Sequence, residues 1–266
     1  MISRNAMDAF NKFDKWGKEI PDYDKEAIAK VTSLIPKDVN SILDLGCGDG
    51  RITNELLGFK RVIGLDFAKV ALKYVKVDRV LGSCANIPFH KNSFDLMVIT
   101  QVLEHLSNEG YEKTVKEIEG LSPRYIIVGV PYKQDMRSLL CKCSNCGYTY
   151  LPSNNIGEHV RSFSEKKLAS LFSYYIVDSI SYAGKSRTDP LLRIKHLLGY
   201  YYTVAKYSPE PCPRCGSSRQ FSRRKGLFYR VISSISWRIG RRRPVFIITR
   251  YMQCSQSRGG NIHRKG

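Results

Sequence analysis

The stretch SILDLGCGDG, residues 41–50, constrains the fold of this chain more than any other part of the sequence. An apolar run that ends in an acid and three glycines is typical of a strand followed by a sharp turn around a ligand, because glycine lets the backbone approach a bound molecule closely. The glycines are spaced as Gly46-x-Gly48-x-Gly50 and Arg51 follows them, so the G-x-G-x-x-G fingerprint of dinucleotide-binding proteins is absent. No G-x-x-x-x-G-K-[ST] string occurs either, which excludes a P-loop.

Asp44, in the first apolar run, indicates which kind of ligand the turn favours. A carboxylate so close to the glycines repels phosphates and attracts an ammonium group. S-adenosylmethionine (SAM) carries an ammonium group and a sulfonium but no phosphate, so it fits this turn. Asp66 closes the second apolar run, RVIGLD, where a carboxylate can accept hydrogen bonds from ribose hydroxyls. The two acids together favour SAM as the cofactor.

Apolar runs alternate with helix-like stretches from residue 41 onward, which is typical of a parallel sheet with crossover helices. The pattern predicts an α/β fold: a Rossmann-like, doubly wound and mostly parallel seven-stranded sheet with an antiparallel last strand. The run FDLMVIT is nearly continuous in apolar residues, as expected for a strand buried on both faces. The predicted strands are 42–45, 61–66, 80–81, 94–100, 125–130, 175–182 and 244–252, and the predicted helices are 52–57, 68–75, 109–121 and 164–172.

Breaks in this alternation divide the chain into segments. A stretch with three Cys and several Asn, Gly and Pro indicates an insertion after the fifth strand, and a long basic stretch separates the last two strands. The expected divisions are an N-terminal helical segment covering the cofactor site (1–40), a SAM-binding core (41–135), a Cys-rich insertion (136–160), a core continuation (161–183), a basic insertion (184–243), the last core strand (244–254) and a disordered basic tail (255–266).

Five short motifs occur in a recognisable order: DLGCGDG at 44–50, GLD at 64–66, CANIPF at 84–89, SFDLMVI at 93–99 and VLEHL at 102–106. Together they resemble the class I SAM-dependent methyltransferases, and most of all the type 11 group that includes the ubiquinone- and menaquinone-pathway enzymes. The resemblance covers residues 40–131, with weaker support from HVRSFSEKKLASLF at 159–172. It implies a SAM-dependent methyltransferase.

The same resemblance implies which residues hold the cofactor. The glycine turn would line the methionine and ribose end, Asp66 would bind the ribose and Phe67 would lie against the adenine. Family members carry an acid that contacts the adenine amine after the third strand, and here Ser83 stands in its place as an uncharged acceptor. The implied cofactor-binding set is Asp44, Gly46, Cys47, Gly48, Asp66, Phe67, Ser83, Cys84, Ala85 and Thr100.

The end of the fourth strand offers candidate catalytic residues. Glu104 and His105 follow it at the carboxyl edge of the sheet, where ligands bind in such folds. His105 would act as a general base or orient the acceptor; the alternative is that His105 caps or packs a helix and Glu104 forms a structural hydrogen bond. The [DN]-P-P-[FY] motif of adenine and glutamine amino-group methylases is absent, and the one Pro-Cys pair, at 211–212, lies far from this strand. A small-molecule, glycan or lipid-linked acceptor is therefore favoured.

Two CxxCG motifs, at 143–147 and 212–216, predict a structural zinc site. Each motif places two thiolates on one tight turn, and two such turns complete a tetrahedral Zn²⁺ site. The predicted ligands are Cys143, Cys146, Cys212 and Cys215, with Cys141 and His159 as alternatives. A zinc ion with four protein ligands would organise the acceptor side without catalysing. The other interpretation is two unrelated pairs of reduced thiols.

The chain carries 43 Lys and Arg against 24 Asp and Glu, and the excess is concentrated towards the C-terminus. Residues 211–266 contain fourteen Lys and Arg and no acid. This segment favours a polyanion, either RNA or an anionic lipid surface, although a merely solubilising surface has the same composition. No apolar run is long enough to span a membrane and no secretory signal is recognisable, so we expect a cytoplasmic protein with reduced thiols.

Three functions follow from these features. The first is methyl transfer from SAM to a small-molecule, glycan or lipid-linked acceptor, beside a structural zinc site. The second is methylation of RNA, with the basic C-terminal segment binding phosphates. The third is a non-catalytic module that binds SAM and zinc on a methyltransferase scaffold.

Overall fold

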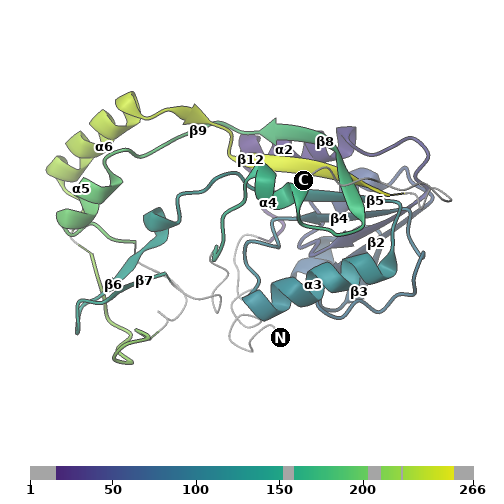
Figure 1. Cartoon of the computed structure of the whole chain (residues 1–266), viewed down its shortest axis with the longest axis horizontal. Coiled ribbons are helices and arrows are strands. Elements are labelled where there is room, and N and C mark those ends of the chain that lie inside the picture. The colour runs from purple at the N-terminus through teal and green to yellow at the C-terminus, as the bar shows by residue number, and fades with distance from the viewer. Residues whose placement is uncertain (1–15, 152–158, 203–210, 223, 255–266) are drawn as a thin grey trace, which may run out of the picture.

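Seven strands form the central sheet of this protein (Figure 1). The computed structural model describes residues 16–151, 159–202, 211–222 and 224–254. The strands lie in the order β3-β2-β1-β4-β5-β12-β8, which confirms the predicted Rossmann-like fold class. Their bounds are β1 Ser41–Leu45, β2 Arg61–Asp66, β3 Asp78–Leu81, β4 Leu96–Thr100, β5 Tyr125–Pro131, β8 Tyr175–Ala183 and β12 Phe246–Gln253.

The first five strands are parallel, and the strand order reverses between β1 and β4. In open α/β sheets, ligands bind outside the carboxyl ends of the strands at such a reversal. The glycine turn follows β1 at this point. The topology therefore places the glycine turn where a ligand is expected.

Strand β12 lies between β5 and β8 and is antiparallel to both. Ile248 of β12 lies opposite Gly129 of β5 and Ser181 of β8. This arrangement confirms the antiparallel last strand. The pairing with β8 contains an irregularity between Arg250 and Tyr251.

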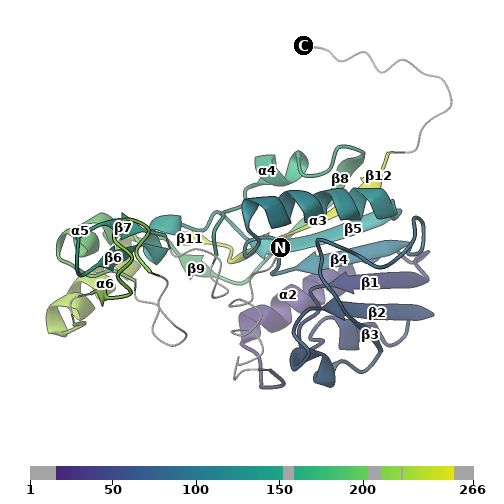
Figure 2. The same cartoon turned by 90° about the horizontal axis from the view of Figure 1, so that it is seen from below.

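Helices lie on both sides of the sheet (Figure 2), and both faces of its central strands are buried, so successive strand residues contribute to opposite apolar layers. Leu43 belongs to the apolar layer beneath α3 (Asn108–Leu121) and α4 (Glu165–Ala169). Ile42 belongs to the layer on the other face, which α2 (Asp22–Ser33) covers. The near-continuous apolar strands follow from this double burial.

Side-chain caps fix where the helices on one face begin. The Ser107 hydroxyl accepts a hydrogen bond from the Gly110 amide at 3.1 Å and starts α3. The predicted cap Ser164 accepts one from the Lys167 amide at 3.4 Å and starts α4. Helix α3 ends at Ser122, whose φ of 53° is left-handed, and Pro123 prevents the helix from continuing.

Two predicted helices are wrong: 52–57 and 68–75 form only short 3₁₀ turns, η1 Thr53–Leu56 and η2 Ala71–Tyr74. Polar side chains hold both segments in place of a continued helix. The Thr53 hydroxyl donates to Asp44, and the Asn54 amide bonds to the backbone of Tyr74 and Lys76.

A smaller group of elements lies beside the sheet, and Figures 1 and 2 both show it projecting from one side of the core. We call it the side lobe; it comprises the described residues among 136–151, 186–202 and 211–243. Strands β5 and β8 both lead into it from their carboxyl ends. Its elements are η3 Met136–Leu139, β6 Cys141–Cys143, β7 Thr149–Tyr150, β9 Ser186–Arg187, α5 Leu192–Leu197, β10 Gln220–Phe221, α6 Leu227–Ile239 and β11 Arg242–Arg243.

The side lobe is built from chain segments that are far apart in the sequence. Strand β6 pairs with β7 and also with β10, and β9 pairs with β11. Within the described residues, no helix is long and apolar enough to cross a membrane. The tail expected to be disordered, 255–266, and the first part of the expected N-terminal segment, 1–15, lie outside the described residues.

Candidate functional site

The glycine turn after β1 has a backbone that only glycine can adopt without strain. Gly46 and Gly48 have φ values of 70° and 53°, in the left-handed region. A Cβ atom on Gly46 would lie 2.3 Å from Cγ2 of Val102, and one on Gly48 would lie 3.0 Å from the Trp16 ring. The turn is also tied to β2, because the Gly46 and Cys47 amides both donate to the Leu65 carbonyl.

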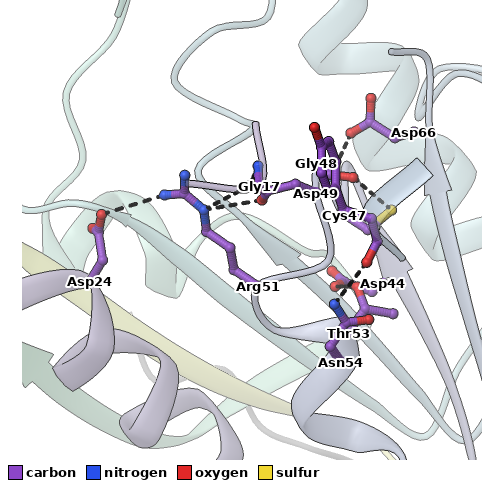
Figure 3. A network of polar contacts seen from close by, with 11 residues as sticks. Gly17, Asp24, Asp44, Cys47, Gly48, Asp49, Arg51, Thr53, Asn54 and Asp66 are labelled. Carbon is purple, nitrogen blue, oxygen red and sulfur yellow. Dashed lines mark hydrogen bonds and ion pairs between the residues drawn. The ribbon is translucent and has the colours of Figure 1, made fainter. Parts of the chain in front are cut away.

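Asp66 at the end of β2 fixes the turn from the other side (Figure 3). One carboxylate oxygen accepts the Gly48 amide hydrogen at 2.8 Å, and the other accepts that of Ala68 at 2.7 Å. Burial raises the pKa of Asp66 although these amides lower it. Each oxygen retains a lone pair for a further donor. Asp66 can therefore hold the turn and accept hydroxyl hydrogen bonds from a ligand at the same time.

Asp44 is nearly inaccessible to solvent and lies behind the turn. Its carboxylate accepts a hydrogen bond of 2.5 Å from the Thr53 hydroxyl. Burial raises the pKa of Asp44 to about 7, and the nearby charge of Asp66 raises it further, while the Thr53 bond lowers it. A cation beside Asp44 would reverse this effect, because it favours the ionised carboxylate.

Residues 16–24 approach the turn from the N-terminal side. Asp49 accepts the Gly17 amide hydrogen at 2.9 Å and pairs with Arg51 at 3.0 Å. Arg51 in turn lies 3.8 Å from Asp24 of α2. Sequence reasoning missed Asp49 and Trp16 as parts of the site, since neither motif nor spacing distinguishes them from other residues in their stretches.

A single cavity of about 1090 Å³ connects these groups. This volume is at the upper end of the range of about 300–1,000 Å³ found for ligand sites, so a nucleoside cofactor would leave room for a second molecule. All ten residues of the predicted cofactor-binding set line the cavity, and so does His105. Its far wall reaches the side-lobe connections, with Tyr132, Gln134, His159, Ser186, Arg243, Pro244, Val245 and Phe246.

Ser83 takes a more local role than the sequence suggested. Its hydroxyl accepts the Ala85 amide hydrogen at 3.2 Å, and its backbone forms a bridge with Asn86. Ser83 thus stabilises the loop that carries Cys84. Burial raises the pKa of the Cys84 thiol to about 12, with Asp66 and Asp44 adding to the effect, so this thiol is protonated at neutral pH.

His105 lies in a turn between β4 and α3, not in a helix, and faces a second histidine. Its ring centroid is 4.7 Å from that of His159 in an edge-to-face arrangement, and both rings line the cavity. The His159 ring also contacts Gln134, because its Nδ1 lies 2.5 Å from the side-chain oxygen of Gln134. The sequence singled out His159 only as an alternative zinc ligand. No signal in the sequence indicated its position beside His105.

The segment around His159 holds the catalytic candidates in place through backbone contacts. The Val160 amide donates to the Glu104 carbonyl at 2.8 Å, and Arg161 donates to the Leu103 carbonyl at 2.7 Å. Arg161 also bonds to the Asn108 side chain at the start of α3. These contacts join residues far apart in the chain into one rigid wall of the cavity.

Glu104 is fully buried behind the two histidines, and neither of its carboxylate oxygens has a hydrogen-bond partner among the described residues. Burial raises its pKa to about 8, while the charge of Arg161 partly opposes this. Burial likewise lowers the pKa of His159. Ligand atoms of Glu104, His105 and His159 lie within 4.8 Å of one another, close enough to share a cation. The predicted structural hydrogen bond of the Glu104 side chain is not seen here.

The four predicted zinc ligands meet in the side lobe. The sulfur atoms of Cys143 and Cys215 are 3.6 Å apart, as are those of Cys146 and Cys212, and all four sulfurs lie within 4.8 Å of one another. Four sulfurs at about 2.3 Å from a tetrahedral Zn²⁺ are about 3.8 Å from each other, so the spacing fits this ion. Neither alternative ligand belongs to the cluster, since His159 lies beside His105 and Cys141 lies outside the four sulfurs.

The two CxxCG turns have the same backbone geometry. Gly147 and Gly216 both have a φ of 71°, and their amides donate to the carbonyls of Cys143 and Cys212. This repeated turn places two thiols of each motif on one side. The cysteines of the described residues form no disulfide.

Comparison with known proteins places the glycine turn and the His105 turn in one domain type. Residues 43–122 match the family model described as a methyltransferase domain. An uncharacterized protein of Methanocaldococcus jannaschii is 32% identical over 121 residues, which are 40% of this chain and 52% of that protein. A Mycolicibacterium smegmatis protein, named a probable SAM-dependent methyltransferase, is 38% identical over 71 residues, which are 24% of this chain and 28% of that protein. The chain thus spans about half, or less, of the length of these curated relatives.

Solved structures extend the likeness of fold to nearly the whole chain. A chain from the complex of the Haloferax volcanii Trm112 methyltransferase activator matches with a TM-score of 0.54 at 13% identity, covering 94% of this chain and 99% of its own. A Listeria monocytogenes protein named as a SAM-dependent methyltransferase matches with a TM-score of 0.50 at 13% identity, covering 88% and 98%. At this level of identity the likeness concerns the fold alone.

Proposed function

We propose that residues 43–122, which match the family model described as a methyltransferase domain, bind SAM, and that the chain methylates a small-molecule, glycan or lipid-linked acceptor. One observation carries the proposal: the glycine turn with its two acids and the His105–His159 pair line the same cavity. A cofactor pocket and a candidate proton acceptor therefore open into one enclosed space. SAM would supply an already activated methyl group there.

We assign the cofactor end of the cavity to Asp44, Asp66 and the glycine turn. The lone pairs left on Asp66 suit the ribose hydroxyls, and the buried carboxylate of Asp44 suits the ammonium group. The left-handed glycines leave no side chain between the backbone and the ligand. The remaining predicted residues, Phe67, Ser83, Cys84, Ala85 and Thr100, would enclose the adenosine.

The acceptor would lie towards the side lobe, next to His105. Because methyl transfer is an in-line displacement, alignment of the acceptor contributes most of the acceleration. A base is required when the acceptor atom still carries a proton. His105 would take that proton and His159 would orient the His105 ring. The resulting positive charge would favour ionisation of the buried Glu104, which would then stabilise it.

We expect replacement of His105 with Ala to lower the rate of methyl transfer by about 100-fold, because general bases contribute about 10²–10⁴-fold. The affinity for SAM, measured by calorimetry, should stay within about threefold, since His105 lies at the acceptor side of the cavity. His90→Ala provides the matched control, because His90 is exposed and lies outside the cavity. Equal losses of rate in both variants would contradict the assigned role.

The raised pKa of Asp44 predicts that SAM binds more tightly as pH rises. Between its unfolded pKa of about 4 and its folded pKa of about 7, the folded protein retains a proton that the unfolded chain has lost. Without ligand, stability therefore decreases as pH rises through this window. An ammonium group requires the ionised carboxylate, so the affinity for SAM should increase about tenfold between pH values of about 5.5 and 7.5.

Calorimetric titration of SAM across this pH range measures the effect. The control is Asp44→Asn, which keeps the shape of the side chain and cannot ionise. Its affinity for SAM should be low and independent of pH. If the affinity of this variant for SAM still increased with pH as it does in the unchanged protein, another group would bind the ammonium.

We also propose that Cys143, Cys146, Cys212 and Cys215 hold a structural Zn²⁺. The spacing of the sulfurs and the repeated glycine turns support this assignment. With four sulfur ligands the ion would have no open position, so it would hold the side lobe together and take no part in the reaction. The side lobe continues into the far wall of the cavity through Ser186 and Arg243, and zinc would thereby shape the acceptor side.

The acceptor class can be tested with SAM that carries an isotopically labelled methyl group. The full-length protein is incubated with an extract of cells that lack its gene, and the extract is then separated into small molecules, lipids and RNA. Label in the small-molecule or lipid fraction supports the proposal. Label in RNA would favour the alternative, in which residues 211–266 bind phosphates; no label in any fraction, together with SAM binding, would favour the non-catalytic module.

A further inference from the structure

Helix α6, residues Leu227–Ile239, carries a stripe of apolar side chains that are about half exposed or more in the described part of the chain. Leu227 is 79% exposed, and the others are about half exposed. Since successive helical residues are rotated by about 100°, these side chains share an arc of about 120° on one side of the helix. The members of this stripe are Leu227, Phe228, Val231, Ile235 and Ile239.

The opposite side of α6 is anchored to the rest of the side lobe, so the stripe is not needed for folding of the helix. Ile232 and Ser236 are buried, and the Ser236 hydroxyl bonds to Asp189. Tyr229 packs against Tyr200 with ring centroids 4.8 Å apart. The helix therefore has one side fixed in the protein and a second apolar side that faces outward.

Positive charges lie beside the stripe, and Arg238 falls within its arc; the acid that contacts α6 among the described residues, Asp189, is paired with Lys195. Residues 211–266 contain no Asp or Glu. Exposed basic residues precede α6, occur within it and follow it: Arg224, Lys225, Arg230, Arg238, Arg241 and Arg242. Aliphatic and aromatic side chains on one side of a helix with Lys and Arg around them are the pattern of helices that lie in a membrane interface.

We propose that α6 docks in the plane of an anionic lipid surface, with the stripe Leu227–Ile239 inserted among the acyl chains near the headgroups. The Arg and Lys side chains beside the stripe would bind lipid phosphates. Long basic side chains can reach the headgroups while their stems stay in the apolar layer.

The charge distribution favours a lipid surface over the other partners that such a helix could meet. A second copy of this chain would bring an equally basic surface against the first, and like charges repel. RNA would satisfy the basic residues but would leave the aliphatic stripe in water, because single strands are bound by aromatic stacking and positive grooves. An anionic bilayer can pair with the basic side chains and also remove the apolar side chains from water.

Docking would also orient the cavity. Helix α6 ends at Ile239, and β11 follows and pairs with β9. The next residues, Arg243 to Phe246, line the far wall of the cavity together with Ser186 of β9. A bilayer in contact with α6 would therefore lie close to the acceptor side of the protein.

Co-sedimentation of the full-length protein with vesicles tests the proposal without reference to SAM or activity. The vesicles consist of phosphatidylcholine alone or with about 30% phosphatidylglycerol. We expect binding to the anionic vesicles that decreases as salt is added, and little binding to the neutral ones. No binding to anionic vesicles, or equal binding to both kinds, would overturn the proposal.

Paired variants separate the apolar and the charged contributions. Phe228→Ser with Ile235→Ser should weaken binding to anionic vesicles about tenfold or more, because two apolar side chains would no longer be removed from water on docking. Arg230→Gln with Arg238→Gln should weaken it by a similar factor and reduce the dependence on salt. Both pairs are exposed, so the fold, checked by circular dichroism, should be retained.

The matched control is Ile176→Ser with Ile180→Ser, which removes two exposed side chains of similar size from β8, in the core sheet. This variant should bind vesicles like the unchanged protein. Equal weakening by the control would show that the α6 stripe is not the docking surface. Two further results would contradict the proposal if the protein does not bind anionic vesicles. One is tight, salt-dependent binding of an RNA oligonucleotide, and the other is a dimer that the α6 variants dissociate.

Discussion

Replacing Asp66 with Ala is expected to reduce the affinity for SAM by about 1,000-fold. The carboxylate would accept two ribose hydroxyl hydrogens, and hydrogen bonds to a charged group are worth about 1.5–3 kcal/mol each, so the loss of two corresponds to about three powers of ten. The same substitution removes the acceptors of the Gly48 and Ala68 amides, so the glycine turn loses its fixed shape as well. Calorimetric titration with SAM and with S-adenosylhomocysteine measures the effect.

Asp78→Ala is the matched control for Asp66→Ala. It removes the same charge from the neighbouring strand β3, where the side chain is exposed and lies outside the cavity. Its affinity for SAM should stay within about twofold, as expected for a surface site without direct contacts. If Asp66→Ala remains folded by circular dichroism and binds SAM normally, the ribose is bound elsewhere in the cavity.

Loss of zinc is expected to unfold the side lobe and leave the central sheet folded. Structural Zn²⁺ sites contribute about 10–16 kcal/mol of apparent binding free energy at neutral pH, which exceeds what a small apolar cluster can supply. Among the described residues, the apolar cluster around the cysteines adds only Tyr150, Tyr202 and Cys141. The purified protein should contain about one equivalent of zinc, and Cys143→Ser with Cys212→Ser should contain almost none.

Hydrogen exchange with mass spectrometry measures where protection is lost in that double variant. Exchange should become fast in β6, β7 and β10, and stay slow in β1 and β4, which lie in the middle of the sheet. Cys254→Ser is the control, because that cysteine is exposed and distant in sequence from both CxxCG motifs. A zinc content well below half an equivalent in the unchanged protein would contradict the metal assignment.

The sheet and the glycine turn were accessible to sequence reasoning because their signals are local. A strand buried on both faces must be apolar throughout, and the turn needs glycine where φ is positive, as at Gly46 and Gly48. The cysteine spacing was equally direct, since each CxxCG motif forms its turn from consecutive residues. The residues at a few neighbouring positions are enough to predict such features.

Features that depend on distant contacts were not accessible. The segments predicted as helices form the short turns η1 and η2, whose residues Thr53 and Asn54 bond to groups outside η1. His159 meets His105 only because Val160 and Arg161 attach to the turn after β4. The role of Ser83 in its own loop is similar, because a serine hydroxyl can serve a ligand or the backbone equally well. No spacing rule indicates which of these partners a side chain will find.

The position of β12 has a consequence for how the chain acquires its structure during synthesis. Strand β8 leaves the ribosome before β12, yet in the sheet it touches only β12 and not β5. The nascent chain must therefore complete the second CxxCG motif and α6 before β8 can join the sheet. Until then, the edge of β5 stays open to incorrect pairing, which is a recognised route to aggregation. Assembly of the side lobe can thus begin before the core closes, and insertion of β12 between β5 and β8 is the step that completes the sheet.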